Sequence, residues 1–218
     1  MYFESREQAG QQLSIELVEK YRYENCAVVA LSDGAVLVGE QIAGNLHCVL
    51  MMLLTEEIAI PGEGMSFGAI SQDGSFTYNG MFSTGEIEEY ASEFHGYLDE
   101  QKRIAFQKMN RLLGDGGIMD NELLRDRVVI LVSDGVDNGA AIDVAINFMK
   151  PIRVKKLVVA TPTASVQAVD RLHILADELH ILDVKDNFMG VDHYYNANII
   201  PSHEETIAKI NQIVLNWR

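Results

Sequence analysis

The stretch that decides the fold reads Val129-Ile130-Leu131-Val132-Ser133-Asp134-Gly135-Val136-Asp137-Asn138-Gly139-Ala140-Ala141. Its first four residues are apolar and mostly β-branched, which is typical of a strand covered on both faces of a parallel sheet. An acidic turn with two glycines follows, and the chain then enters a helical pattern. Such a turn exposes backbone N–H groups at the start of a helix, where they can bind an anion. The stretch therefore predicts a ligand site at the end of a buried strand.

The two aspartates of this turn allow two interpretations. Asp134 stands at the end of the strand, where its carboxylate can accept hydrogen bonds from the hydroxyl groups of a sugar. Alternatively, Asp134 and Asp137 do no more than cap the turn and the helix that follows it. The residues of the turn leave both interpretations open.

Similar apolar runs and helical patterns alternate along the rest of the chain. They predict strands at residues 26–31, 47–54, 128–132, 156–160 and 179–182. They predict helices at residues 5–21, 36–45, 84–113, 140–149, 165–176 and 203–217, with a hairpin at 68–78. This order indicates an α/β fold with a parallel sheet of about five strands, flanked by helices. Ligands bind such sheets at the carboxyl ends of the strands, so the loops at 32–36, 55–64, 133–139 and 161–165 are candidate site segments.

Length and composition favour one domain. The chain has 218 residues, of which 48% are hydrophobic, so it can form a sizeable core without disulfides or metal. We expect a single domain over residues 1–218, with core strands at about 26–54 and 128–183 and a hairpin and helical insertion at about 66–113. Cys26 and Cys48 lie in apolar runs, which predicts two reduced core residues.

The charge balance excludes several classes of partner. The formal net charge is −15, which repels polyanions and argues against nucleic acids and anionic membranes. The longest apolar run, residues 48–54, is too short to span a membrane, and the first residues do not resemble a signal peptide. The expected location is the cytoplasm. The same negative field disfavours phosphorylated ligands unless a local site overrides it.

Three smaller patterns carry further predictions. Ser5 and Gln8 have the spacing of a capping box at the start of the first helix. In the helix at 84–113 one apolar face should be buried or form a dimer surface, and it consists of Ile87, Tyr90, Ala91, Phe94, Tyr97 and Leu98. The pairs His47–Cys48 and Asp192–His193 hint at metal ligands but lack a recognised ligand spacing.

The stretch at 129–141 resembles the phosphoribosyl-pyrophosphate (PRPP) motif of type I phosphoribosyltransferases, in which a strand enters two adjacent acids, a glycine and a Thr-Gly-x-Thr turn. Residues 31–39 occupy the place of the pyrophosphate loop of an uncharacterised bacterial branch of that family. Residues 5–10 with Leu13 resemble its opening helix, and residues 68–74 its hairpin. The residues that fit its aromatic C-terminal segment are Phe188, Val191, Tyr194 and Tyr195.

The resemblance implies a type I phosphoribosyltransferase-like sheet with a small hood, a homodimer, and a glycosyltransferase of nucleotide metabolism. It implies that Asp134 is the catalytic residue and binds Mg²⁺, and that a phosphorylated sugar or nucleotide is the ligand. The turn that would bind PRPP comprises Ser133, Asp134, Gly135, Val136, Asp137, Asn138, Gly139, Ala140 and Ala141, with backbone N–H groups of residues 135–140 on the 5-phosphate. The pyrophosphate-loop position comprises Ser32, Asp33, Gly34 and Ala35.

The chain also departs from the motif of the family. Ser133 stands at the first acid, Asn138 and Ala141 replace two threonines, and Asp137 adds a negative charge. Asp33 replaces an arginine, and Thr55-Glu56-Glu57 replaces a segment that usually carries Arg-Lys. Each change removes a donor or a cation, or adds an anion. They predict a weak or inactive transferase that acts as a ligand-binding or assembly module. The alternative is an active Mg²⁺-dependent enzyme that transfers phosphoribose from PRPP to a nucleobase-like acceptor.

Overall fold

The fold is built around a five-stranded parallel sheet. The computed structural model describes residues 2–62, 66–114 and 119–215. The order of the strands in the sheet is β2-β1-β6-β7-β8, and every neighbouring pair is parallel. The strands are β1 (Cys26–Ala30), β2 (Val49–Met52), β6 (Val128–Val132), β7 (Lys156–Ser165) and β8 (Glu178–Lys185). The predicted parallel sheet of about five strands, flanked by helices, is confirmed.

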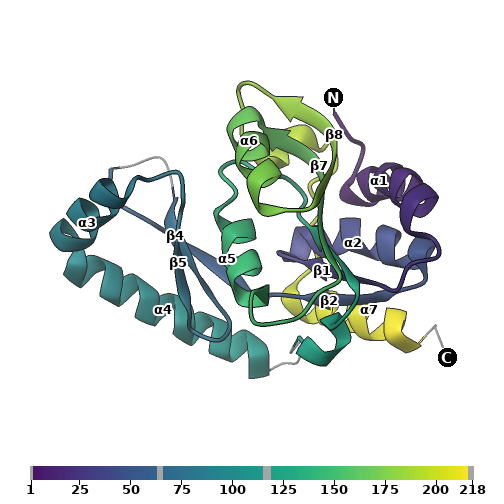
Figure 1. Ribbon diagram of the computed structural model, residues 1–218, viewed down its shortest axis with the longest axis horizontal. Coiled ribbons are helices and arrows are strands. Elements are labelled where there is room, and N and C mark those ends of the chain that lie inside the picture. The colour runs from purple at the N-terminus through teal and green to yellow at the C-terminus, as the bar shows by residue number, and fades with distance from the viewer. Residues whose placement is uncertain (1, 63–65, 115–118, 216–218) are drawn as a thin grey trace.

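Helices cover both faces of this sheet (Figure 1). One face packs against α1 (Arg6–Tyr21), α2 (Asp33–Leu46) and α7 (His203–Leu215), and the other against α5 (Ala140–Met149) and α6 (Val166–Leu175). Alternate residues of each strand point into the two cores, so the strands must be apolar throughout: Val28 and Ile130 face one core, and Val29 and Leu131 the other. None of the helices in the described ranges is long and apolar enough to cross a membrane.

A second, antiparallel sheet lies beside the first. Its order is β3-β4-β5, formed by β3 (Thr55–Ala59), β4 (Ser66–Ser71) and β5 (Phe76–Tyr78). Helices α3 (Thr84–Glu93) and α4 (His95–Gly114) follow it, and α5 packs against all three of its strands (Figure 1). The predicted hairpin is present. The predicted loop at 55–64 is wrong for residues 55–59, because β4 offers a free edge with which Thr55–Ala59 pairs.

Two further segments differ from the prediction near the site. Residues 161–165, predicted as a loop, continue β7, since β8 extends beside them and Val136 N–H donates to Thr163 O at 3.0 Å. Helix α2 begins at Asp33 rather than 36, because the Ser32 hydroxyl accepts the Ala35 N–H at 2.9 Å and caps it. The pyrophosphate-loop position is therefore the first turn of a helix.

The remaining helices and strands agree with those predicted from the sequence, apart from small differences. Ser5 accepts the Gln8 N–H at 3.3 Å, but the buried Gln8 Oε1 has no partner, so only half of the capping box forms. The helix predicted at 84–113 breaks at Phe94, and Tyr97 is 39% exposed rather than buried with its face. Two short 3-10 helices occupy Asn121–Leu124 and Val191–Tyr194. The last residues of the helix predicted to reach 217 lie outside the described ranges.

Candidate functional site

The candidate site lies where the chain leaves β1 and β6. These two strands are neighbours in the sheet. From β1 the chain crosses to β2, on one side of the pair, and from β6 it crosses to β7, on the other side. This change of direction is a topological switch point, which is where open α/β sheets bind ligands. The Ser32 hydroxyl donates to Asp134 Oδ1 at 3.0 Å, so the loops at 32–36 and 133–139 meet as predicted.

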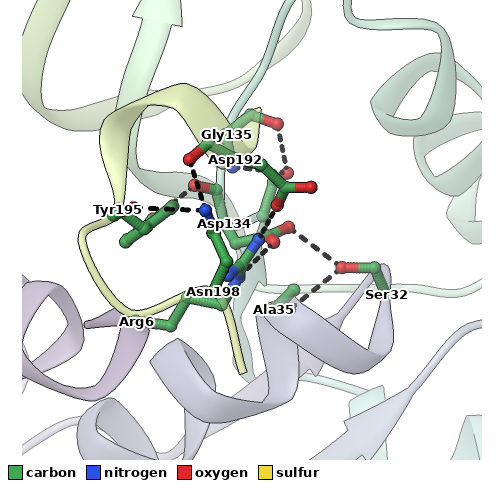
Figure 2. Close-up of polar contacts among 9 residues, drawn as sticks. Arg6, Ser32, Ala35, Asp134, Gly135, Asp192, Tyr195 and Asn198 are labelled. Atoms are coloured by element: carbon green, nitrogen blue, oxygen red, sulfur yellow. Dashed lines mark hydrogen bonds and ion pairs between the residues drawn. The ribbon is translucent and has the colours of Figure 1, made fainter. Parts of the chain in front are cut away.

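The carboxylate of Asp134 is engaged in a buried ion pair. The guanidinium of Arg6, on α1, donates through Nε to Asp134 Oδ2 at 2.7 Å, and the two side chains are 1% and 11% exposed. The same guanidinium donates to Asp192 Oδ1 at 2.6 Å and to Asn198 Oδ1 at 3.1 Å. It also stacks 4.5 Å from the ring centroid of Tyr195 (Figure 2). Arg6 thus joins the start of the chain to the turn after β6 and to the C-terminal segment.

The electrostatics of this cluster keep Arg6 charged. Burial alone lowers the pKa of the guanidinium, but the hydrogen bond to Asp134 and the charge of that carboxylate outweigh it, so the pKa is raised above its ordinary value. Tyr195 donates its hydroxyl to the Asp134 backbone carbonyl at 2.5 Å. Burial, and then the negative charge of Asp134, raise the pKa of Tyr195. The predicted aromatic segment therefore supports the Arg6–Asp134 pair.

Arg6 is not among the site residues predicted from the sequence, although it binds Asp134 directly. A usable signal was present, because Arg6 falls at helical spacing from Ala9, Leu13 and Leu17, which are all buried. An arginine on the buried face of a helix requires an anionic partner. Periodicity could thus have predicted a buried ion pair, although not that Asp134 is the partner.

Three residues of the pyrophosphate-loop position, Ser32, Asp33 and Gly34, line one cavity with Asp134, but each of the four residues has different contacts. Ser32 caps α2 and binds Asp134, whereas Asp33 Oδ1 pairs with Nδ1 of His203 on α7 at 3.0 Å. Ala35 is fully buried. Gly34 lies against the ion pair: a Cβ there would stand 2.3 Å from Asp134 Oδ2 and 2.8 Å from Arg6 Nε. Glycine is thus needed at 34 for Arg6 and Asp134 to meet.

We expect Gly34→Ala to destabilise the protein by about 1–3 kcal/mol, because the added methyl group has to displace Asp134 or Arg6. Gly44→Ala, in the same helix, is the matched control, since nothing lies within 4 Å of its Cβ position. There alanine should stabilise by up to about 1 kcal/mol through helix propensity. Urea denaturation of both variants measures the difference. Equal stability of the two variants would contradict the close packing at Gly34.

Most residues of the turn after β6 line a different cavity from the one that Asp134 lines. A cavity of about 270 Å³ is lined by Glu57, Ser133, residues 135–142, Phe188, Gly190 and Val191. Among the described residues, its charged lining consists of Glu57 and Asp137, which are both acids. Asp134 instead lines a cavity of about 350 Å³ together with Arg6, Ser32, Asp33 and Gly34. The predicted single site is therefore divided, because Arg6 holds the Asp134 side chain on the other side of the turn.

Half of the backbone donors predicted to bind phosphate are engaged within the protein. Gly135 N–H donates to Ser133 Oγ at 3.3 Å, Val136 N–H donates to Thr163 O at 3.0 Å, and Ala140 N–H donates to Asn138 Oδ1 at 2.9 Å. The N-cap residue of α5 is Gly139, and the side chain that accepts the first helical N–H is that of Asn138 rather than Asp134 or Asp137. The positive φ of Gly139, 77°, turns the chain into that helix. These three amides would have to leave their partners to bind a phosphate, and the role of residues 135–140 stays a prediction.

The two acids that line the cavity at the turn after β6, Glu57 and Asp137, both have raised pKa values. For Glu57 the causes are first lost hydration and then the charges of Asp137 and Glu56, which together outweigh a hydrogen bond from Ser66. For Asp137 the cause is lost hydration. A carboxyl group whose pKa is higher in the folded state favours folding at low pH, and this contribution is lost as the pH rises through the folded pKa. Near neutral pH the ionised pair destabilises the fold.

We therefore expect Glu57→Gln with Asp137→Asn to raise the melting temperature at pH 7, and the difference to shrink as the pH falls towards about 4. The rise should be only about 1–3 °C, since both side chains remain partly exposed to solvent. Thermal denaturation from pH 4 to 8 measures it. Glu89→Gln, on the exposed face of α3, is the control and should change little. A lower melting temperature at pH 7 would contradict the repulsion between the two carboxylates.

The chain is similar in sequence to known proteins and similar in fold to solved structures. No family model matches the chain. Two proteins from two strains of Mycobacterium tuberculosis, each described as "Putative phosphoribosyl transferase", are 26% identical to it over 211 residues. These cover 96% of this chain but only 46% of theirs, so the chain spans less than half the length of the curated relatives it matches.

Solved structures agree with the observed architecture. The protein TT1426 from Thermus thermophilus is 26% identical, with a TM-score of 0.71, and the match covers 100% of this chain and 99% of that one. A hypoxanthine phosphoribosyltransferase from Staphylococcus aureus is 10% identical, with a TM-score of 0.51 over 86% of this chain and 78% of that one. At that identity the likeness concerns the fold.

Proposed function

We propose that this chain, which is type I phosphoribosyltransferase-like in sequence and fold, binds PRPP weakly or not at all and has little transferase activity. Its role is that of a ligand-binding or assembly module. The observation that carries the proposal is the engagement of Asp134 by Arg6 and Ser32, because this is the carboxylate that a transferase would use on its sugar substrate.

The charges around the turn support the proposal. PRPP carries several negative charges, whereas the cavity at the turn offers Glu57 and Asp137. Asp33 stands where the family motif has an arginine, and Glu56 is paired with Lys108, whose Nζ lies 2.7 Å from Oε1. The N-terminus of α5 supplies only about half a unit of positive charge. Polyanion binding therefore lacks the cations it requires.

The engaged backbone N–H groups of the turn should lower its affinity for phosphate. Losing one or two charge-assisted hydrogen bonds, at about 1.5–3 kcal/mol each, lowers affinity by about one to four orders of magnitude. Asn138 occupies one donor directly at the start of α5, and the chain itself occupies the amide of Val136. These bonds would have to break before both amides could bind a phosphate.

The proposal is tested by measuring pyrophosphate release from PRPP and Mg²⁺ over a panel of purine and pyrimidine bases. We expect release no faster than in the protein-free blank. A base-dependent release that scales with protein concentration would instead establish the alternative, an active Mg²⁺-dependent phosphoribosyltransferase.

We also propose that the chain forms the predicted homodimer, but through the outer faces of α3 and α4, because the predicted face at 87–98 packs against the chain's own core except at Tyr97. No residue of α3 is fully buried, and Tyr97 and Ile104, seven positions apart and so on one face of α4, are 39% and 46% exposed. Light scattering at several concentrations should give a molar mass twice that of the chain. The Tyr97→Glu variant should give a lower molar mass, closer to that of a single chain. A mass equal to one chain at every concentration would contradict the dimer, and an unchanged dimer in Tyr97→Glu would contradict this surface.

A further inference from the structure

The contacts of Asp134 show whether the Mg²⁺ implied by the family resemblance fits this site. Mg²⁺ requires oxygen ligands at about 2.0–2.1 Å in octahedral geometry. Both carboxylate oxygens of Asp134 already accept hydrogen bonds, Oδ2 from Arg6 Nε at 2.7 Å and Oδ1 from the Ser32 hydroxyl at 3.0 Å. A metal ion on either oxygen would have to displace one of these donors.

The second acid near Asp134 is held by the same guanidinium. Arg6 donates to Asp192 Oδ1 at 2.6 Å, so one arginine bridges the two carboxylates that could share a metal ion (Figure 2). No group of three or more histidine, cysteine, aspartate or glutamate side chains that could hold a metal occurs among the described residues. The residues present therefore do not fit Mg²⁺.

Arg6 is built into the fold rather than resting on the surface. Its side chain is 1% exposed, its ring partner Tyr195 is 4% exposed, and the backbone of Phe3 bonds to the segment that follows Tyr194. Gly34 leaves room for the ion pair and for nothing larger. Because α1, the start of α2, the turn after β6 and the C-terminal segment all meet at this guanidinium, it cannot swing aside without opening the structure.

We propose that Arg6 is the resident cation of this site: it permanently neutralises Asp134 in the place of a divalent metal ion, and ligand binding here is independent of metal. The inference deepens the proposed function and rests on it only in taking Asp134 as part of the ligand site. It assigns Arg6 a role at the site in addition to its contribution to folding.

Titration with Mn²⁺ alone, followed by the electron paramagnetic resonance signal of the free ion, tests this in the intact chain. The net charge of −15 means that surface acids will bind some Mn²⁺, so the comparison is with Asp134→Asn. We expect the same number of bound ions and the same affinities in both proteins. The loss of one bound ion in Asp134→Asn, or a tenfold weaker affinity, would overturn the proposal.

Arg6→Gln provides the converse test. Without the guanidinium, Asp134 and Asp192 are free to share a metal, so this variant should gain one bound Mn²⁺, and adding Asp134→Asn should remove it. Arg6→Lys keeps the charge and should gain none. A folded Arg6→Gln protein, judged by circular dichroism, that gains no ion would contradict the proposal; if it does not fold, the comparison of the wild type with Asp134→Asn decides alone. Since no PRPP is present, the metal test can fail while the proposed function holds. Likewise, the chain can release pyrophosphate from PRPP, against the proposed function, while the metal test succeeds.

Discussion

Restoring the family residues at five positions should strengthen PRPP binding by about ten- to ten-thousand-fold. The variant combines Ser133→Asp, Asp137→Ala, Asn138→Thr, Ala141→Thr and Asp33→Arg. It adds an arginine at the pyrophosphate position, moves the acid of the turn from position 137 to position 133, and releases the Ala140 amide from Asn138. Isothermal titration calorimetry with Mg²⁺ and PRPP measures the gain relative to the wild type.

The control for this experiment is a change of net charge away from the site. Glu88→Arg, on the exposed side of α3, changes the net charge by two units, as the five substitutions together do. If the long-range field alone governed affinity, both proteins would gain equally. We expect the remote variant to gain much less. An unchanged affinity in the five-fold variant would show that the departures from the motif do not determine PRPP binding.

Replacing Arg6 by alanine should lower the free energy of unfolding by about 3–5 kcal/mol, because it leaves the carboxylate of Asp134 buried without its ionic partner. For a chain of this length the melting temperature should fall by about 6–20 °C. Thermal denaturation by circular dichroism measures the loss.

Arg103→Ala is the matched control, since Arg103 also pairs with an acid, but on the surface of α4. The side chains of Arg103 and Glu100 are 58% and 50% exposed, so we expect a loss of no more than about 1 kcal/mol. Equal losses of unfolding free energy in Arg6→Ala and Arg103→Ala would contradict the inference that the buried contacts of Arg6 stabilise the fold.

The central strand and the helix after it were predictable at their observed bounds, Val128–Val132 and Ala140–Met149. Both are delimited locally, the strand by its apolar run and the helix by the turn with two glycines before it. Parallel topology also brought the loops after β1 and β6 together, as their Ser32–Asp134 hydrogen bond confirms. Local pattern and topology were thus sufficient for the frame of the site.

The segments that were not predicted depend on partners distant in the chain. β3 forms against the edge of β4, and its own residues have little strand character, with Ile58 its one large apolar side chain. The pairing of Arg6 with Asp134 joins residues 128 positions apart, which no local pattern records. The resemblance to the family predicted a site at Asp134 and the turn. The direction in which the Asp134 side chain points depends on Arg6, Ser32 and Gly34, which no local pattern records.

The most direct test of this account is a calorimetric titration of the unmodified chain with PRPP in the presence of Mg²⁺. Because Asp134 is engaged by Arg6, and because the turn presents acids and only part of its amides, we predict no measurable heat or a Kd weaker than about 1 mM. Micromolar binding by the unmodified chain would contradict the account.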